Sequence, residues 1–347
     1  MKKHPVLKGL LIAGLAVIVL IGILAAYLWN KLDLIVYDNE IDHSAYETID
    51  PEAGEDDSEL VIDIGDSEVQ EDAPEIPDSD LISHKSVINI LLIGTDERTR
   101  DFNVNARSDS MILVSINKHT NSVKLISLER AIGVPILDGV YKGQSDWLTH
   151  VFRYGGADLL TQTVEHCFKI KVDHYVRLNF HSVEEVVDVI GGIDLELTAI
   201  EASALNNTDI FRTGQKRLSA GTNHMTGSAA LGFARLRSID SDWQRVVRQR
   251  TVIMAVVDKL KGSSLTTLND LADQVLPLIQ TNMSKLDIAQ LMLYAPSFLT
   301  ADFDQMTVPD SDRYGYVKIM RDRYGFAVDY EEVNPMLKEY LYGDLLD

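Results

Sequence analysis

A long apolar stretch near the N-terminus is the strongest constraint on how this chain folds. Leu10 to Trp29 is a run of 20 residues without a charged side chain. A helix of this length spans about 30 Å, the thickness of the hydrocarbon core of a bilayer, so the stretch predicts a transmembrane helix. A cleaved signal peptide is the alternative. The run is longer than the usual apolar region of about 7–15 residues, and no small-residue cleavage site follows it.

The basic residues around this stretch predict its orientation. Lys2, Lys3 and Lys8 precede it, and only Lys31 follows closely. Cytoplasmic flanks of membrane helices carry the excess of Lys and Arg. We therefore expect residues 1–9 in the cytoplasm, a signal anchor at 10–29 that crosses the cell membrane once, and the rest of the chain on the extracellular side.

The segment from Asp38 to Asp80 carries most of the negative charge. It has 18 acidic residues and no Lys or Arg, in a chain of formal net charge -21. Such a composition is typical of a disordered, self-repelling segment. We predict an acidic extracellular linker at 30–83, with a reach of about 35–40 Å as a coil, that holds the folded domain away from an anionic membrane surface. The remaining residues, 35 acidic and 32 basic, are nearly neutral.

From residue 84 onward, short apolar runs alternate with amphipathic stretches. Three runs rich in β-branched residues predict central strands at 87–94, 110–117 and 122–128. Further patterns predict strands at 173–180 and 193–197, and helices at 156–170, 181–192, 226–237, 240–260, 264–279 and 284–299. This alternation predicts an α/β fold class, with a single α–β–α layered domain around a central mixed sheet at 84–347.

The single cysteine, Cys167, cannot form a disulfide within the chain. It falls in a helical apolar pattern, so we interpret it as a small buried residue rather than a nucleophile. No Cys or His residues have zinc-binding spacing.

Polar side chains gather at three places where predicted strands end, the edge at which open α/β sheets bind ligands. The first group is Asp96 with Arg107 and Asp109, and the second is Arg130. The third is the stretch from Gly232 to Arg250, which contains five arginines.

These residues suggest a site for a phosphorylated ligand. Asp96 and Asp109, at neighbouring strand ends, can share a Mg²⁺ ion, which prefers oxygen ligands from one or two carboxylates and from phosphates. Guanidinium groups can neutralise the same phosphates with two parallel hydrogen bonds. The candidates are Arg107, Arg130, Arg235, Arg237 and Arg245.

The predicted helix at 240–260 divides the arginines. Asp242, Arg245 and Gln249 share one face by the i, i+3, i+4 rule, and a carboxylate there would hold arginines in place. Arg248 and Arg250 point elsewhere, and we interpret them as structural. The simpler alternatives are a solvated arginine-rich helix face, with ion pairs worth about 0–1 kcal/mol, and an Arg107–Asp109 salt bridge at a strand end. Nucleic acid is disfavoured, because no aromatic residues are interleaved with the basic ones.

Six motifs, in order, resemble those of the LytR-CpsA-Psr family. They read "INILLIGTDER", "ARSDSMILVSIN", "KLISLER", "VFRYGGADLLTQTVE", "DHYVRLNFHSVEEVVDVIGGIDLEL" and "LSAGTNHMTGSAALGFARLRSIDSDWQRVVRQR". The resemblance is continuous from about residue 86 to residue 260 and weaker to the C-terminus. A signal anchor followed by an extracellular domain also matches the family's layout.

The resemblance implies a phosphotransferase of Gram-positive cell walls. Such an enzyme moves a glycopolymer, for example a teichoic acid or capsular polysaccharide, from undecaprenyl pyrophosphate onto peptidoglycan, and holds the carrier's prenyl chain in an apolar tunnel. The resemblance assigns magnesium binding to Asp96 and Asp109, with Arg107, Arg130 and Asp109 as catalytic residues. It assigns phosphate binding to Arg107, Arg130, Arg235, Arg237, Arg245 and Gln249.

The chain departs from the family pattern around Arg130. Many relatives have S-x-P-R-D where this chain has Glu129 in place of Pro and Ala131 in place of Asp. Residues 147–149 read Trp-Leu-Thr instead of the common K-I-N. The departures around Arg130 motivate one alternative, a non-catalytic module that binds polyprenyl phosphates or regulates the envelope. A lipid pyrophosphatase on the same site is a further alternative.

Overall fold

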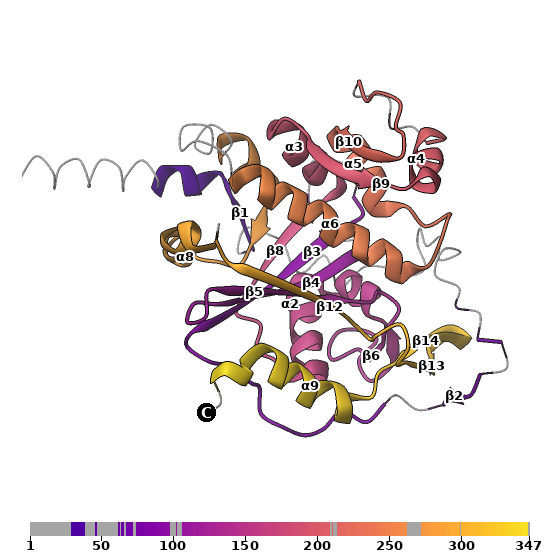
Figure 1. Cartoon of the computed structure of the whole chain (residues 1–347). Coiled ribbons are helices and arrows are strands. Elements are labelled where there is room, and N and C mark those ends of the chain that lie inside the picture. The colour runs from indigo at the N-terminus through magenta and orange to yellow at the C-terminus, as the bar shows by residue number, and fades with distance from the viewer. Residues whose placement is uncertain are drawn as a thin grey trace, which may run out of the picture.

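A seven-stranded sheet lies at the centre of the computed structural model, which describes residues 29–38, 46, 62, 64–65, 67–71, 74–97, 102, 106–208, 210, 214–261, 272–298 and 300–345 (Figure 1). The strand order is β1-β11-β8-β3-β4-β5-β12. In that order the bounds are Val36–Tyr37, Gln280–Thr281, His174–Asn179, Val87–Thr95, Ser108–Asn117, Ser122–Leu128 and Asp302–Val308.

The sheet is mixed, as predicted. Strand β3 pairs antiparallel with β4 and parallel with β8, and β5 pairs antiparallel with β4 and parallel with β12. A bulge between Gly94 and Thr95 leaves Thr95 opposite Ser108, so the end of β3 and the start of β4 meet at one edge of the sheet. This edge carries the first group of predicted site residues.

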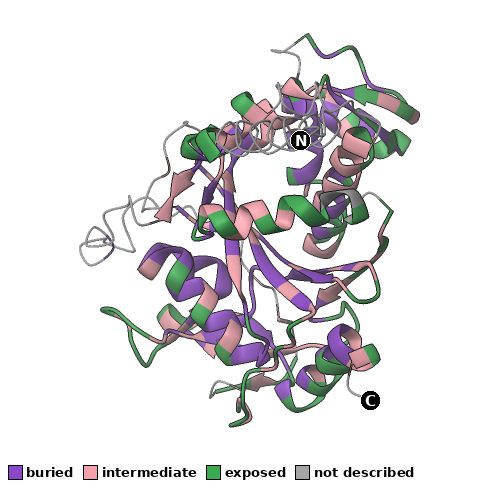
Figure 2. Ribbon diagram, turned by 90° about the vertical axis from the view of Figure 1, so that its left-hand side faces the viewer, coloured by how far each residue is buried: buried purple, intermediate pink, exposed green. Residues whose placement is uncertain are grey.

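Alternating side chains of the central strands face two helical layers. On β3, Leu91 and Ile93 join a cluster with residues of α2 (Leu148–Phe168) and α9 (Tyr330–Tyr342). On the other face, Ile90 packs in a cluster with residues of α6 (Asp242–Lys261) and α8 (Lys285–Phe298). Most of the sheet is therefore buried between helices (Figure 2), which confirms the α–β–α layering.

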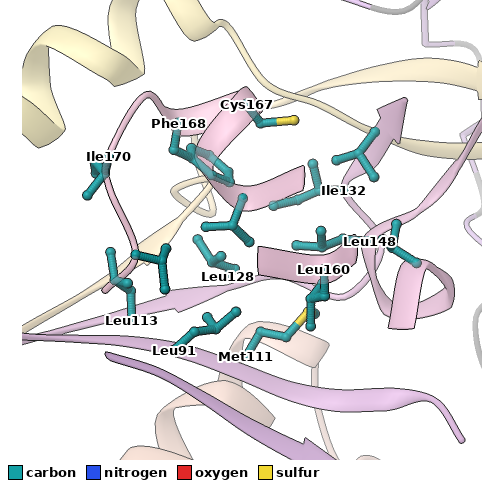
Figure 3. Packing of buried hydrophobic residues seen from close by; sticks show 14 of the residues in the cluster. Leu91, Met111, Leu113, Leu128, Ile132, Leu148, Leu160, Cys167, Phe168 and Ile170 are labelled. Carbon is teal, nitrogen blue, oxygen red and sulfur yellow. The ribbon is translucent and has the colours of Figure 1, made fainter. Parts of the chain in front are cut away.

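The larger core cluster lies between the sheet and α2. Figure 3 shows Leu91, Met111 and Leu113 on the strands below Leu160 and Phe168. The predicted apolar role of the cysteine is confirmed, because Cys167 is fully buried in this cluster and burial raises the pKa of its thiol to about 12.

Helix α2 is longer than predicted, and the two glycines of its motif lie inside it. It begins at Leu148 rather than at Gly156, and only Gly155 and Gly156 interrupt its helical geometry. Gly156 has φ of 65°, a conformation that glycine adopts without steric cost. Residues 148–154 are all buried, so they lack the one-sided polarity that reveals a helix in a sequence.

A second, smaller cluster carries the arginine-rich stretch. It includes α3 (Phe180–Val189), β9 (Ile193–Leu197), α4 (Ala199–Asn206), β10 (Gly221–Met225) and α5 (Gly227–Arg235). The side chain of Asn179 accepts a hydrogen bond from the Ser182 amide (2.8 Å) and caps α3. Thr198 and Glu201 form a reciprocal capping box on α4.

The remaining elements are short strands and short 3-10 helices. Strands β6 (Gly133–Pro135) and β7 (Ser145–Trp147) form one pair, and β13 (Gly315–Ile319) joins β14 (Arg323–Ala327) and β2 (Val69–Gln70) in another sheet. Short 3-10 helices occur at Leu32–Leu34, Leu276–Leu278, Met320–Asp322 and Gly343–Leu345. The helix predicted at 264–279 lies partly outside the described residues.

Two short strands lie within the predicted linker at 30–83. Strand β1 pairs Val36 with Gln280 before the acidic segment begins, and β2 pairs Val69 with Tyr316 inside it. The chain is therefore fastened to the folded domain on both sides of residues 38–68. Pairings of two residues are too short to leave a strand pattern in the sequence.

The predicted transmembrane stretch, except for Trp29, lies outside the described residues. Among the helices that the structure does describe, none combines the length and apolar character needed to span a bilayer.

We expect Gly227→Ala to destabilise the layer that carries the arginines. A Cβ atom at Gly227 would lie 2.0 Å from the backbone oxygen of Glu184, so α5 would have to move away from α3. The free energy of unfolding of the chain from residue 29 should fall by about 3 kcal/mol in urea titrations. Gly315→Ala is the control, since its added Cβ would lie 3.6 Å from that of Ala327. Equal losses in both variants would contradict the close contact.

Candidate anion-binding site

The paired ends of β3 and β4 bring the first predicted group together. Asp96 follows β3, and its carboxylate accepts hydrogen bonds from the Arg107 amide (2.9 Å) and from Arg107 Nε (3.0 Å). The Asp96 amide in turn donates to the Arg107 carbonyl oxygen (3.2 Å). Arg107 therefore pairs with Asp96, and Asp109 is a second carboxylate close enough to interact with its charge.

Arg130 connects the sheet edge to helix α6. It follows β5, and its buried guanidinium donates from Nη1 to Asp109 Oδ1 (3.0 Å). Its Nε and Nη2 donate to the two carboxylate oxygens of Asp242 (3.3 Å each). One side chain thus joins a carboxylate of β4 to a carboxylate at the start of α6.

Asp242 is the centre of the arginine cluster. Besides Arg130, its carboxylate contacts Arg245 through Nε (2.8 Å) and Nη2 (2.9 Å), and Arg237 through Nε (3.6 Å). Arg245 Nη1 also donates to the Asp109 carbonyl oxygen (3.0 Å), as does Gln249 Nε2 (3.4 Å). The predicted shared face of Asp242, Arg245 and Gln249 is confirmed, and so is the role of a carboxylate that holds arginines.

Arg248 and Arg250 are structural, as predicted. Arg248 pairs with Glu201 (2.9 Å) and Asp240, and it donates to the Leu236 carbonyl oxygen (2.9 Å). Arg250 donates to three side chains of β5 and β12, which are Ser127, Gln305 and Thr307. Both guanidinium groups are buried, so the alternative of a solvated arginine face is wrong for this part of α6.

An apolar pocket of about 110 Å³ adjoins the cluster. Its lining includes Leu92 and Ile93 of β3, Val183 of α3, Leu231 of α5 and Ile253 of α6. It is also bordered by Asp109, Arg235, Arg237, Arg245 and Gln249.

Arg235 reaches this pocket from the end of α5. Its guanidinium carbon lies 4.2 Å from the centroid of the Phe180 ring, a cation–π contact. Since the Arg235 side chain is exposed, it can contact a ligand at the pocket with little desolvation.

The charges of the cluster leave an excess of positive charge. Four guanidinium groups interact with three carboxylates: those of Arg107, Arg130, Arg237 and Arg245 with those of Asp96, Asp109 and Asp242. Burial alone would raise the pKa of Asp109, but Arg130, Arg245 and Arg107 lower it below its ordinary value. Burial and the repulsion from Arg130 lower the pKa of Arg245 to about 10. An anion would relieve this repulsion.

Glu129 is a buried acid beside the arginine cluster that the sequence did not identify as a site residue. Its carboxyl group is fully buried, faces Asp242, and receives no hydrogen bond from a donor group. Burial raises its pKa to about 8, and the charge of Asp242 adds to this effect. At neutral pH Glu129 therefore carries a proton, whereas Asp242 is ionised. The sequence signal for this residue was its place in a motif that usually has proline.

The other departures from the family pattern are accommodated by the fold. Ala131 packs in an apolar cluster with Trp147, and Asp242 supplies the carboxylate that orients Arg130. The Thr149 amide donates a hydrogen bond to the Arg130 carbonyl oxygen (3.1 Å). The Thr149 hydroxyl donates to the Ser108 carbonyl oxygen (2.9 Å). The altered residues thus still support the backbone of the site.

The two predicted magnesium ligands, Asp96 and Asp109, lie at the neighbouring ends of β3 and β4. Both carboxylates are close enough to Arg107 for their negative charges to stabilise its charged guanidinium. Within the described ranges, no group of three or more His, Cys, Asp or Glu residues is arranged to hold a metal. Mg²⁺ commonly binds through one or two carboxylates, completed by phosphate oxygens and water. The donor set fits an ion that binds together with a phosphorylated ligand.

The mixed α/β fold and the arginine cluster beside an apolar pocket define a protein suited to an anion that carries an apolar group. The LytR_cpsA_psr family model matches residues 53–339. The chain belongs to this family.

Relatives with assigned names include two transferases. The chain is 34% identical over 207 residues to the polyisoprenyl-teichoic acid–peptidoglycan teichoic acid transferase TagU of Bacillus cereus, a match that covers 59% of this chain and 63% of the relative. It thus spans just under two thirds of TagU. It is 31% identical over 264 residues to the transferase TagT of Bacillus subtilis, covering 75% of this chain and 78% of that protein.

Solved structures of this kind have the same fold. The crystal structure of B. subtilis TagT matches with a TM-score of 0.58 and 25% identity, covering 80% of this chain and 99% of that one. A structure of TagT bound to LI-WTA matches with a TM-score of 0.59 and 27% identity, covering 75% and 91%.

We expect Glu129→Gln to change the pH dependence of stability. In the folded chain Glu129 keeps its proton up to a pH of about 8, whereas its ordinary pKa is 4.5. Between these values folding requires proton uptake, so this residue makes the folded state less stable as the pH rises. The variant lacks this titrating group. Between pH 5 and pH 8, its free energy of unfolding should therefore rise relative to that of the parent by roughly 1–3 kcal/mol.

Urea titrations at both pH values measure this difference. Glu332→Gln is the matched control, because Glu332 lies on the surface in a pair with Arg313. Parallel stability curves for Glu129→Gln and the parent would show that Glu129 is ionised in the folded chain.

Proposed function

We propose that this protein is a membrane-anchored, Mg²⁺-dependent phosphotransferase that moves a glycopolymer from undecaprenyl pyrophosphate onto peptidoglycan. The polymer is a teichoic acid, a capsular polysaccharide or a related polysaccharide. The observation that carries the proposal is the positively charged cluster around Asp242, directly beside an apolar pocket. A lipid-linked pyrophosphate combines the two features that this arrangement complements.

The arginines would bind the pyrophosphate from different sides. Arg107 is held by Asp96 at the sheet edge, and Arg235 and Arg237 lie beside the pocket at the end of α5. Because their partners already fix them, these groups lose little freedom when a ligand binds. The pocket would receive the first part of the prenyl chain, in accord with the tunnel that the family resemblance implies.

Transfer would proceed by attack of a peptidoglycan hydroxyl on the phosphorus nearer the sugar. The bond from this phosphorus to the undecaprenyl phosphate oxygen breaks, and the glycopolymer becomes linked through a phosphodiester. Arg107 and Arg130 would stabilise the charge that develops on the phosphate oxygens, the main contribution of a protein to phosphoryl transfer. Asp96 and Asp109 would hold Mg²⁺, which neutralises phosphate charge when it is bound.

The proposed location follows from the N-terminal stretch. With residues 10–29 as a single-pass anchor and residues 1–9 in the cytoplasm, the folded domain would lie on the cell-wall side of the cell membrane. Both proposed substrates, the lipid carrier and peptidoglycan, would then be within its reach.

We expect Arg237→Ala to weaken ligand binding and Arg250→Ala to lower stability. Arg237 is partly exposed at the border of the pocket, so its loss should weaken binding of farnesyl pyrophosphate about tenfold and lower stability much less than the loss of Arg250. Arg250 is buried among hydrogen-bond partners of β5 and β12, so its loss should lower the free energy of unfolding by about 2–4 kcal/mol. Calorimetric binding and urea titration measure the two effects. Similar behaviour of both variants would contradict the division between ligand-binding and structural arginines.

We expect transfer to require Arg107, Asp109 and Mg²⁺. The assay follows transfer of a saccharide from a polyprenyl pyrophosphate to peptidoglycan oligomers. Arg107→Ala and Asp109→Asn should each lower the rate by a factor of about 100 or more, and chelation of Mg²⁺ should stop it. Arg313→Ala, which removes an exposed ion pair with Glu332, is the control.

The same assay separates the alternatives. Release of lipid monophosphate without an acceptor would favour a pyrophosphatase. Lipid binding without turnover on any acceptor would favour the non-catalytic module that the departures around Arg130 motivate. Unchanged transfer in both variants would refute the assigned site.

A further inference from the structure

Helix α8 has an apolar outer surface that the proposed reaction does not use. Leu286, Met292, Leu293 and Tyr294 are all more than 40% exposed, and Leu293 reaches 80%. Four exposed large apolar side chains on one helix form a patch of the kind that marks an interaction surface. We call these four residues the α8 patch.

The opposite side of α8 is fixed in the domain. Ile288 and Leu291 pack in the cluster that covers the sheet, together with Met283 and Ile253. A helix that is apolar on both sides is normally buried on both sides. The outer side of α8 therefore lacks the covering that its composition calls for, at least among the residues that the structure describes.

The N-terminal end of the described chain lies beside the start of α8 (Figure 1). Lys285 Nζ lies 5.5 Å from the centroid of the Trp29 ring and also pairs with Asp33. Trp29 and Leu34 are themselves exposed. The apolar surface therefore continues from the α8 patch to the residue that ends the long apolar stretch.

Chain length keeps this end of the domain close to Trp29. Strand β1 begins at Val36, seven residues after Trp29, and pairs with β11, which precedes α8. Seven residues reach about 25 Å even when fully extended, and the turn of helix after Trp29 shortens this reach. Wherever Trp29 lies, the α8 patch lies near it.

We propose that the α8 patch, together with Trp29 and Leu34, rests in the interfacial region of the lipid bilayer. This inference rests on the proposed anchor at 10–29, which places Trp29 at the membrane surface. Tyr294 and Trp29 are suited to this region, because an aromatic ring with a polar edge prefers the boundary between hydrocarbon and water. Lys118, 5.5 Å from the Tyr294 ring, and Lys285 can extend their ammonium groups toward lipid phosphates.

Site-specific labelling of the full chain in lipid nanodiscs tests this orientation. Cys167 is fully buried, so an introduced cysteine can be labelled selectively. Leu293→Cys reports on the α8 patch. Met336→Cys is the matched control, an exposed position on α9 on the other side of the sheet. A fluorophore at each position is quenched either by a spin-labelled lipid or by aqueous iodide.

We expect the lipid quencher to reduce the emission at position 293 at least threefold more than at position 336, and iodide to show the reverse. Leu286→Cys should behave like Leu293→Cys. Equal iodide quenching at 293 and 336, in chains that remain bound to the discs, would overturn the proposal. Protection of 293 from iodide without lipid quenching would also overturn it, in favour of a second copy of the chain on this surface.

The result does not depend on the proposed reaction. Absence of transfer activity in discs where position 293 is quenched by lipid would refute the proposed function and leave the orientation intact. Loss of the chain from the discs would refute the anchor, and with it the orientation.

Discussion

The arginine site depends on the contacts of one carboxylate, that of Asp242. Arg130 and Arg245 are both buried, and each would be strongly destabilising without a partner of opposite charge. Asp242 pairs with both and joins the end of β5 to the first turn of α6. Asp109 completes the connection, through its side chain to Arg130 and its carbonyl oxygen to Arg245. The network satisfies the charges internally and still leaves positive charge for a ligand.

Much of this arrangement could be predicted from local patterns. The central strands and α6 have regular periodicity, and spacing along α6 was enough to assign Asp242 a supporting role. The pairing of Arg107 with Asp96 was not predictable from spacing, because a bulge at Gly94 and Thr95 sets how the ends of β3 and β4 align. The beginning of α2 and the pairing of β1 were missed for a related reason. Wholly buried or very short elements leave no alternation between polar and apolar positions.

Glu129 gives the site a property that spacing alone could not reveal. An ionised acid at this position would add negative charge to the arginine cluster and weaken its attraction for phosphate. Burial and the neighbouring Asp242 keep the acid neutral at ordinary pH, so the cluster retains its charge. The residue occupies a place where relatives have proline, and it was accommodated without loss of the contacts of Arg130.

Strand β1 changes the meaning of the acidic segment. Strands β1 and β2, which respectively precede and lie within this segment, are both paired with the domain. The chain as a whole has a formal net charge of -21, and charges in water act over about 8–10 Å at physiological ionic strength. An anionic ligand would gain little from long-range steering. Its selection would rest on contacts made after arrival, which favours a ligand delivered along a surface over one captured from solution.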